Sequence, residues 1–130
     1  MEAVDINGFT IGADGPFTLI AGPCVIEDEA GAYEIASFLK TVTEKLDIPC
    51  IFKASYDKAN RTSIASYRGP GIDRGLEILS KIRNDLNLPV ISDVHQLSEI
   101  QAAAEVLDVI QIPAFLCRQT DLVVKAAQTG

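Results

Sequence analysis

Three cations gather in one short stretch, "FKASYDKANRTS", which spans residues 52–63. Lys53 stands at the end of an apolar run, and Lys58 and Arg61 follow among small polar residues. The chain as a whole is acidic, with a formal net charge of -7. Binding to nucleic acid or to an anionic membrane needs many cations spread over a surface. A local cluster in an acidic chain therefore indicates a site for a small anion.

Phosphate is the anion that this cluster suits best. Arg61 and Arg118 can each hold a phosphate group through the planar fork of the guanidinium. Each ammonium group beside a phosphate contributes about 1 kcal/mol in water and about 4 kcal/mol in a partly dry pocket, so the cluster needs a pocket. The alternative for Lys53 is that its stem lies along the strand end and its charge reaches solvent.

A second group of polar residues ends two later apolar runs, "SDVH" and "VIQIPAF". The alternation of a strand places Asp93 and His95 on one face, and Gln111 belongs to the next strand at the same level. Together they can position a water or a carbonyl group and move protons. The alternative for His95 is a structural histidine.

The three cysteines, widely spaced and odd in number, predict neither a disulfide framework nor a CxxC zinc pair. Cys24 ends the first apolar run in "AGPC", where it is either a buried small apolar residue or a thiolate ligand of a divalent metal. Cys50 should face the helices, and Cys117 follows the fourth strand, so neither suggests chemistry.

The composition predicts one domain over residues 1–130. The chain has 130 residues, of which 48% are hydrophobic and 22% charged, as in ordinary soluble proteins that fill a core. No stretch approaches the roughly 18 apolar residues of a membrane span, and "MEAVDING" lacks the features of a signal peptide. We therefore expect a cytoplasmic protein that binds neither nucleic acid nor membrane.

Local patterns predict an N-terminal β-hairpin within residues 1–16, turning at Asn7-Gly8, and then four βα units over 17–130. The expected strands lie in "FTLIAG", "CIFKAS", "PVISDV" and "DVIQIPA". The expected helices are 28–46, 73–86, a third that Ser98 caps and a fourth from Gln119 or Thr120. In the first helix, Ile35, Phe38, Leu39, Val42 and Leu46 form one apolar stripe.

One face of each expected strand begins apolar and becomes polar toward the carboxyl end, as in Ile51, Lys53 and Ser55. A (β/α)₈ barrel makes this pattern, and an open doubly wound sheet would also place its site there. A barrel needs eight βα units and about 250 residues. The chain is therefore interpreted as the N-terminal half of a barrel, whose outer strands would be unpaired edges.

Five motifs in order, "AGPCVIE", "FKASYDKANRTS", "SYRGPG", "SDVH" and "VIQIPAFLCRQTDL", resemble the 3-deoxy-D-manno-octulosonate 8-phosphate synthases. These transferases, also named 2-dehydro-3-deoxyphosphooctonate aldolases, condense phosphoenolpyruvate with arabinose 5-phosphate. The resemblance covers about residue 17 to the end. It implies a barrel, a homotetramer and a place in the biosynthesis of lipopolysaccharide.

The same resemblance implies a role for each matching residue. The residues expected at phosphoenolpyruvate are Lys53, Lys58, Ala114 and Arg118. Those expected at arabinose 5-phosphate are Asn60, Arg61, Thr62 and, at a subunit contact, Phe115. Those expected around the reacting centre are Asp93, His95 and Gln111. The family commonly has Ser in place of Thr62, a change that keeps the hydroxyl.

The family is divided into a metal-dependent class with Cys at the position of Cys24 and a metal-independent class with Asn there. Cys24 thus implies a divalent metal ion, whose other ligands, a His, a Glu and an Asp, come from the second half of the barrel. We accordingly expect the 130 residues alone to be inactive.

Two alternatives remain. The sister enzyme that uses erythrose 4-phosphate shares "AGPC" and the barrel, but typically has Lys-Pro-Arg-Thr where this chain has "KANRT". Ala59 and Asn60 therefore favour the five-carbon sugar. The other alternative is a non-catalytic half-barrel that binds phosphate.

Overall fold

The computed structural model describes residues 3–12 and 15–130 and is a mixed α/β structure. Strands β1 (Val4–Ile6) and β2 (Phe9–Ile11) form the predicted antiparallel hairpin. Gly8 takes φ +107° in its turn, a conformation that favours glycine. Residues 1, 2, 13 and 14 of the predicted segment lie outside the described residues.

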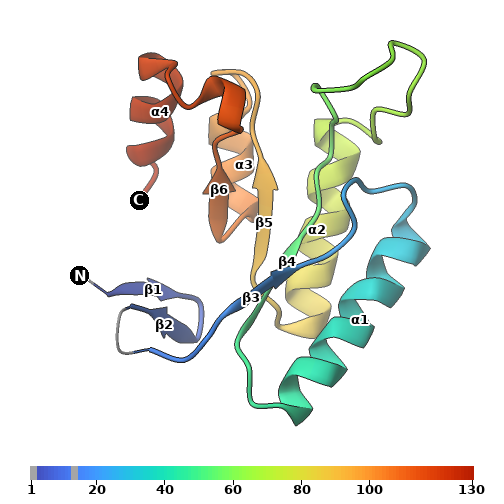
Figure 1. Cartoon of the computed structure of the whole chain (residues 1–130), viewed down its shortest axis with the longest axis vertical. Coiled ribbons are helices and arrows are strands. Elements are labelled where there is room, and N and C mark those ends of the chain that lie inside the picture. Colours follow the sequence, from blue (N-terminus) through green and yellow to red (C-terminus); the bar gives the residue numbers. More distant parts are fainter. Residues whose placement is uncertain (1–2, 13–14) are drawn as a thin grey trace.

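Four parallel strands form the main sheet, in the order β3 (Leu19–Ala21), β4 (Cys50–Lys53), β5 (Val90–Asp93) and β6 (Val109–Gln111). The four predicted strands are therefore confirmed. Figure 1 shows them side by side, with the loop that follows β4 rising beyond their ends. No further strand pairs with β3 or β6 within the described ranges, so both are edges of the sheet.

Helices connect the strands. They are α1 (Glu29–Lys45), α2 (Ile72–Leu86), α3 (Ile100–Val106) and α4 (Thr120–Ala127), with a short 3₁₀ helix, η1 (Ala114–Leu116), before α4. The side chain of Asp28 caps α1 by accepting a hydrogen bond from Gly31 N at 2.8 Å. The predicted cap of the third helix was wrong, because Ser98 lies in a turn and Glu99 occupies the N-cap position.

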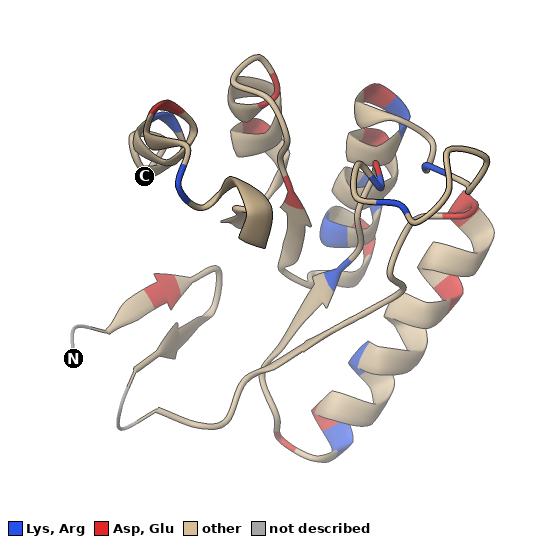
Figure 2. Ribbon diagram, turned by 45° about the horizontal axis from the view of Figure 1, so that its top comes forward, with Lys and Arg blue, Asp and Glu red and all other residues tan. Residues whose placement is uncertain are grey.

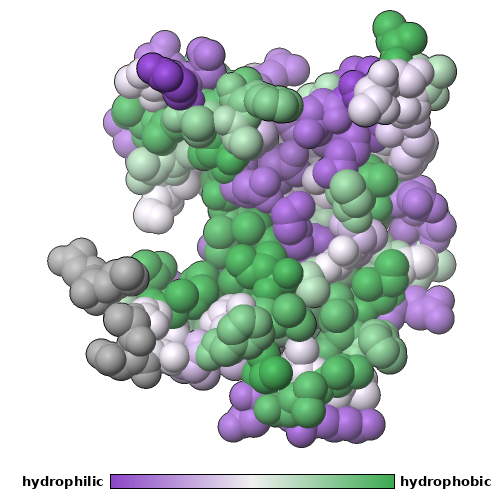
Figure 3. All heavy atoms as spheres, viewed as in Figure 1, coloured by the Kyte–Doolittle hydropathy of each residue, from purple (hydrophilic) through white to green (hydrophobic). Residues whose placement is uncertain are grey.

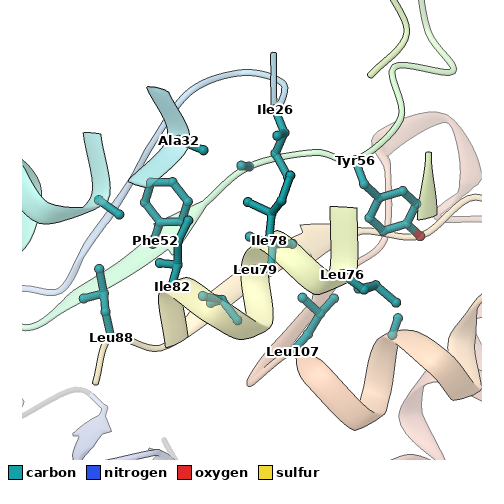
Figure 4. Close-up of a cluster of buried hydrophobic side chains, with 14 of the residues drawn as sticks. Ile26, Ala32, Phe52, Tyr56, Leu76, Ile78, Leu79, Ile82, Leu88 and Leu107 are labelled. Atoms are coloured by element: carbon teal, nitrogen blue, oxygen red, sulfur yellow. The ribbon is translucent and has the colours of Figure 1, made fainter. Parts of the chain in front are cut away.

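The two faces of the sheet are covered differently, as the alternation of the strands predicts. Cys50, Phe52 and Ala54 face the helices and belong to the main hydrophobic core, in which Phe52 lies between α1 and α2 (Figure 4). On the other face, Ile51 and Ile91 pack with Ile6 of the hairpin. The hairpin therefore covers the apolar end of the face that carries Lys53 and Asp93.

The predicted apolar stripe of α1 faces the core only in part. The buried residues of α1 are Ala32, Ala36 and Thr43, none of which belongs to the predicted stripe. Phe38 of the stripe is 66% exposed. The small residues let α1 approach the sheet closely, and no described element lies beyond the edge strand β3 to cover the large ones. Ile35 and Phe38 consequently line an open groove with Ala21.

None of the described helices combines the length and the hydrophobicity that crossing a bilayer would require.

Candidate active site at the carboxyl ends of the strands

The loop that follows β4 is closed at its base. The Arg68 guanidinium donates to both carboxylate oxygens of Asp57, at 2.8 and 2.5 Å. The backbone N–H of Lys58 donates to Arg68 O at 2.5 Å, and that of Gly71 to Tyr56 O at 3.1 Å. Residues 59–67 therefore form an excursion with fixed ends.

Gly69 permits this closure. It takes φ +116°, and a Cβ atom there would lie 2.3 Å from Tyr56 O. Only glycine tolerates both the backbone conformation and the close approach. The "RGPG" motif is thus explained by the geometry of the loop.

Lys and Arg residues, in blue, lie at the carboxyl end of β4 and on the loop that follows it (Figure 2). Lys53 ends β4, the Lys58 ammonium donates to Ser55 Oγ at 3.1 Å, and Arg61 donates to Lys58 O at 2.9 Å. In the part of the chain that the structure describes, none of the three forms a salt bridge, and Arg61 Nε is buried without a partner. Their charges are available to an anion.

Arg68 differs, because Asp57 neutralises it. The hydrogen bonds from Arg68 lower the pKa of the Asp57 carboxyl, so this carboxylate stays charged. Both residues line the pocket described below, and neither was predicted from the sequence. A carboxylate eleven residues before its partner has no local signature; only the closed loop brings the two together.

Asp93 and His95 form a buried pair at the end of β5, with Asp93 Oδ2 2.9 Å from His95 Nε2. Burial opposes ionisation of Asp93, but the hydrogen bond from His95, aided by Ser55, lowers its pKa to about 2. The hydrogen bond to Asp93 raises the pKa of His95. The β5–β6 register places Gln111 beside Asp93, as predicted.

Behind this pair lies a contact that the sequence did not reveal. Glu99 Oε2 accepts hydrogen bonds from the His95 backbone N–H at 2.7 Å and from the Tyr56 hydroxyl at 2.9 Å. Burial, and then the Glu99 carboxylate, raise the pKa of Tyr56. The only local hint was the spacing of four residues between His95 and Glu99.

A pocket of about 780 Å³ opens between the loop after β4 and the segment around η1. Hydrophilic atoms gather in this region of the surface, with hydrophobic atoms below them (Figure 3). The lining of the pocket includes six residues predicted from the sequence: Asn60, Arg61, Thr62, His95, Ala114 and Phe115. It also includes Asp57, Arg68 and Gln96. The other six predicted residues lie outside the lining: Cys24, Lys53, Lys58, Asp93, Gln111 and Arg118.

Cys24 is exposed, so the interpretation as a buried apolar residue was wrong. Cys50 is buried against the helices as predicted, and burial raises the pKa of its thiol. Cys117 is exposed. Within residues 3–12 and 15–130, no three His, Cys, Asp or Glu side chains are grouped so that they could hold a metal ion.

Comparison with known proteins identifies the family. The model of the DAHP synthetase I family matches residues 2–130. The chain belongs to this family. Curated proteins of similar sequence also match this chain, and their names agree with the resemblance found in the sequence motifs.

Three relatives are each named 2-dehydro-3-deoxyphosphooctonate aldolase. The protein from Geobacter metallireducens is 58% identical over 98% of this chain and 47% of its own length. That from Pelobacter propionicus is 59% identical over 96% of this chain and 46% of its own length. That from Polaromonas naphthalenivorans is 57% identical over 95% of this chain and 43% of its own length. This member of the DAHP synthetase I family thus spans about half the length of the curated relatives it matches.

The Asp93–His95 pair predicts how stability depends on pH. The pKa of His95 is raised in the folded protein. Its contribution to the free energy of unfolding is therefore complete at a pH below 6.5, the pKa of the unfolded chain, and is lost as the pH rises through the folded pKa. Asp93, whose pKa is lowered from 3.8 to about 2, stabilises the folded protein above pH 3.8 and loses this contribution only as the pH falls toward about 2. Chemical unfolding of wild type and His95→Gln between pH 6 and 9 should show a difference of about 1.5–3 kcal/mol at pH 6 that shrinks with rising pH. A difference that grows with pH would contradict this assignment.

Proposed function

We propose that the protein containing this chain condenses phosphoenolpyruvate with D-arabinose 5-phosphate and water, giving 3-deoxy-D-manno-octulosonate 8-phosphate and inorganic phosphate. The observation that carries the proposal is the set of unpaired cations, Lys53, Lys58 and Arg61, at the carboxyl end of a parallel sheet. The names of the relatives support the choice of substrates.

In the proposed reaction, C3 of phosphoenolpyruvate attacks the aldehyde carbon of the sugar while water adds at C2. Inorganic phosphate then leaves with cleavage of its C–O bond. This chain's residues hold two phosphorylated molecules together against their mutual repulsion, which supplies proximity and electrostatic stabilisation. The Asp93–His95 pair, with His95 at the pocket wall, is suited to orient a reacting group and to exchange a proton with it.

The two phosphates are assigned to different groups of residues. Asn60, Arg61 and Thr62 line the pocket together, which supports their assignment to arabinose 5-phosphate. Lys58 points toward Ser55 and, like Lys53 and Arg118, lies outside the pocket lining, which supports a separate place for phosphoenolpyruvate. Ala114, the fourth residue proposed for phosphoenolpyruvate, lines the pocket and would lie where the two substrates meet. Phe115, 83% exposed at the pocket rim, suits the proposed subunit contact.

We also propose that the whole protein is a (β/α)₈ barrel, of which this chain forms the N-terminal half. Three observations support this: the parallel sheet with edges at β3 and β6, the open apolar groove beside β3, and the greater length of the relatives. A cytoplasmic homotetramer in lipopolysaccharide biosynthesis, with neither nucleic acid nor membrane as a partner, belongs to the same proposal. The 130 residues alone would then lack activity.

The described residues do not form a complete metal site. Cys24 nevertheless offers an exposed soft donor in the segment that follows β3, the kind of ligand that Zn²⁺ or Fe²⁺ accepts. We propose that it is one ligand of a divalent metal whose other ligands come from outside this chain. When bound, such an ion would orient the sugar aldehyde or the water.

The choice of sugar is tested by phosphate release. The full-length protein, given phosphoenolpyruvate with arabinose 5-phosphate or with erythrose 4-phosphate, should prefer the five-carbon sugar by at least about 100-fold in kcat/KM, which corresponds to roughly 2.7 kcal/mol. A preference for erythrose 4-phosphate would instead assign the reaction of the sister enzyme, 3-deoxy-D-arabino-heptulosonate 7-phosphate (DAHP) synthase, to which the name of the family model refers. No release with either sugar would favour a phosphate-binding half-barrel.

The metal proposal is tested by metal content. Cys24→Ala in the full-length protein should lower the metal bound per chain, measured by mass spectrometry after dialysis, at least about tenfold, as loss of a ligand predicts. Cys117→Ala, which removes the other exposed thiol, is the matched control and should keep its metal. Equal metal content in the two variants would contradict a ligand role for Cys24.

A further inference from the structure

We infer that Glu99 is a positioning residue: it fixes His95 against Asp93 and links this pair to the loop that follows β4. The kinetic consequence of this inference rests on the proposed function, whereas the geometric part does not. The carboxylate acts on donors from two different segments, the end of β4 and the end of β5.

One oxygen atom makes both contacts. Glu99 Oε2 accepts the backbone N–H of His95 at 2.7 Å and the Tyr56 hydroxyl at 2.9 Å. Both donors are at least partly buried, and a buried donor that loses its acceptor costs about 1–3 kcal/mol. The two segments are therefore held at a fixed separation by a single side chain.

Helix formation does not explain this use of Glu99. The residue occupies the N-cap of α3, yet its side chain makes no capping hydrogen bond. Glutamate is also absent from the preferred N-cap residues, which are Ser, Thr, Asp and Asn. Its carboxylate turns back toward the strand ends instead, while its backbone N–H closes a turn on Gln96 O at 3.1 Å.

Tyr56 is a rigid donor for this carboxylate. Its side chain is 1% exposed and packs against Gly75 of α2, where a Cβ atom would lie only 2.2 Å from Tyr56 Cβ. Its ring stands edge-on to His95, with centroids 6.1 Å apart and planes at 87°. The next residue, Asp57, begins the closed loop that carries Lys58 and Arg61. Glu99 thereby connects that loop to His95.

The charges around His95 show what Glu99 adds. Asp93 lies on the Nε2 side at 2.9 Å, and Glu99 Oε2 lies 3.8 Å from Nδ1, too far for a hydrogen bond. Asp57 contributes a third, more distant carboxylate, and Tyr56 faces the ring as a neutral phenol. Glu99 therefore acts on the ring through its charge, and on the position of the ring through the His95 backbone.

The test compares Glu99→Gln, Glu99→Ala and Tyr56→Phe in the full-length protein. The amide oxygen of Gln can accept both hydrogen bonds but removes the charge; Ala removes both. Glu105→Ala, an exposed glutamate at the other end of α3, is the matched control. The readouts are the imidazole resonances of His95, identified by their loss in His95→Gln, and kcat and KM with phosphoenolpyruvate and arabinose 5-phosphate.

Glu99→Ala should displace the His95 resonances and lower kcat about tenfold or more, with KM for phosphoenolpyruvate changed less than about threefold, because His95 is moved but the cations are not. Glu99→Gln should restore kcat to within about threefold of wild type while lowering the His95 pKa, since the charge beside Nδ1 is gone. Tyr56→Phe should fall between the two, and Glu105→Ala should match wild type.

The inference is overturned if Glu99→Ala leaves the His95 resonances and kcat unchanged, or if Glu99→Gln is as slow as Glu99→Ala. If Glu99→Ala does not fold, Tyr56→Phe decides: an unaltered His95 spectrum would contradict the link. The spectra are recorded without substrate. A wild-type protein that released no phosphate would therefore overturn the proposed function. The spectra would still test whether Glu99 fixes the position of His95.

Discussion

The parallel register of β4, β5 and β6 is the constraint on which the candidate site depends. Lys53 pairs with Ile91, and Asp93 with Gln111. Since successive side chains of a strand alternate between faces, a slip of one residue would turn the polar ends of these strands toward the helices. The same face carries Ile51 and Ile91 lower down, where Ile6 of the hairpin packs on them. Burial of this apolar floor therefore helps to hold the register that aligns the polar rim.

The distribution of charge explains how an acidic chain keeps free cations. Asp57 is used by Arg68 to close the base of the loop, and Asp93 by His95, so these carboxylates are not available to Lys53, Lys58 or Arg61. Other acidic residues pair with cations away from this site; Glu29, for example, bridges α1 to Arg74 and Lys81 of α2. In a partly dry pocket each unpaired cation would interact with a phosphate by about 4 kcal/mol, so the separation of the two groups matters for binding.

Much of the architecture could be predicted from local patterns, because the hairpin, the four strands and α2 each depend on periodicity and turn chemistry. The stripe of α1 was only partly right: periodicity shows that Phe38 is on an apolar face, but not that β3 is an edge that leaves it uncovered. Ser98 was a reasonable cap by residue type, yet the helix begins after Glu99. The contacts of Glu99 and of Arg68 join residues through the folded loop and turn, and residue types alone do not reveal such contacts. The roles at the two substrates stay predictions.

The central claim is that strand β4 and the closed loop after it carry two groups of cations for two different phosphates. Titration calorimetry of each substrate alone into wild type, Lys53→Ala and Arg61→Ala full-length protein tests it most directly. The account predicts that Lys53→Ala weakens phosphoenolpyruvate binding about tenfold or more and leaves arabinose 5-phosphate within about threefold, and that Arg61→Ala does the reverse. Equal losses for both substrates in both variants, or none in either, would contradict it.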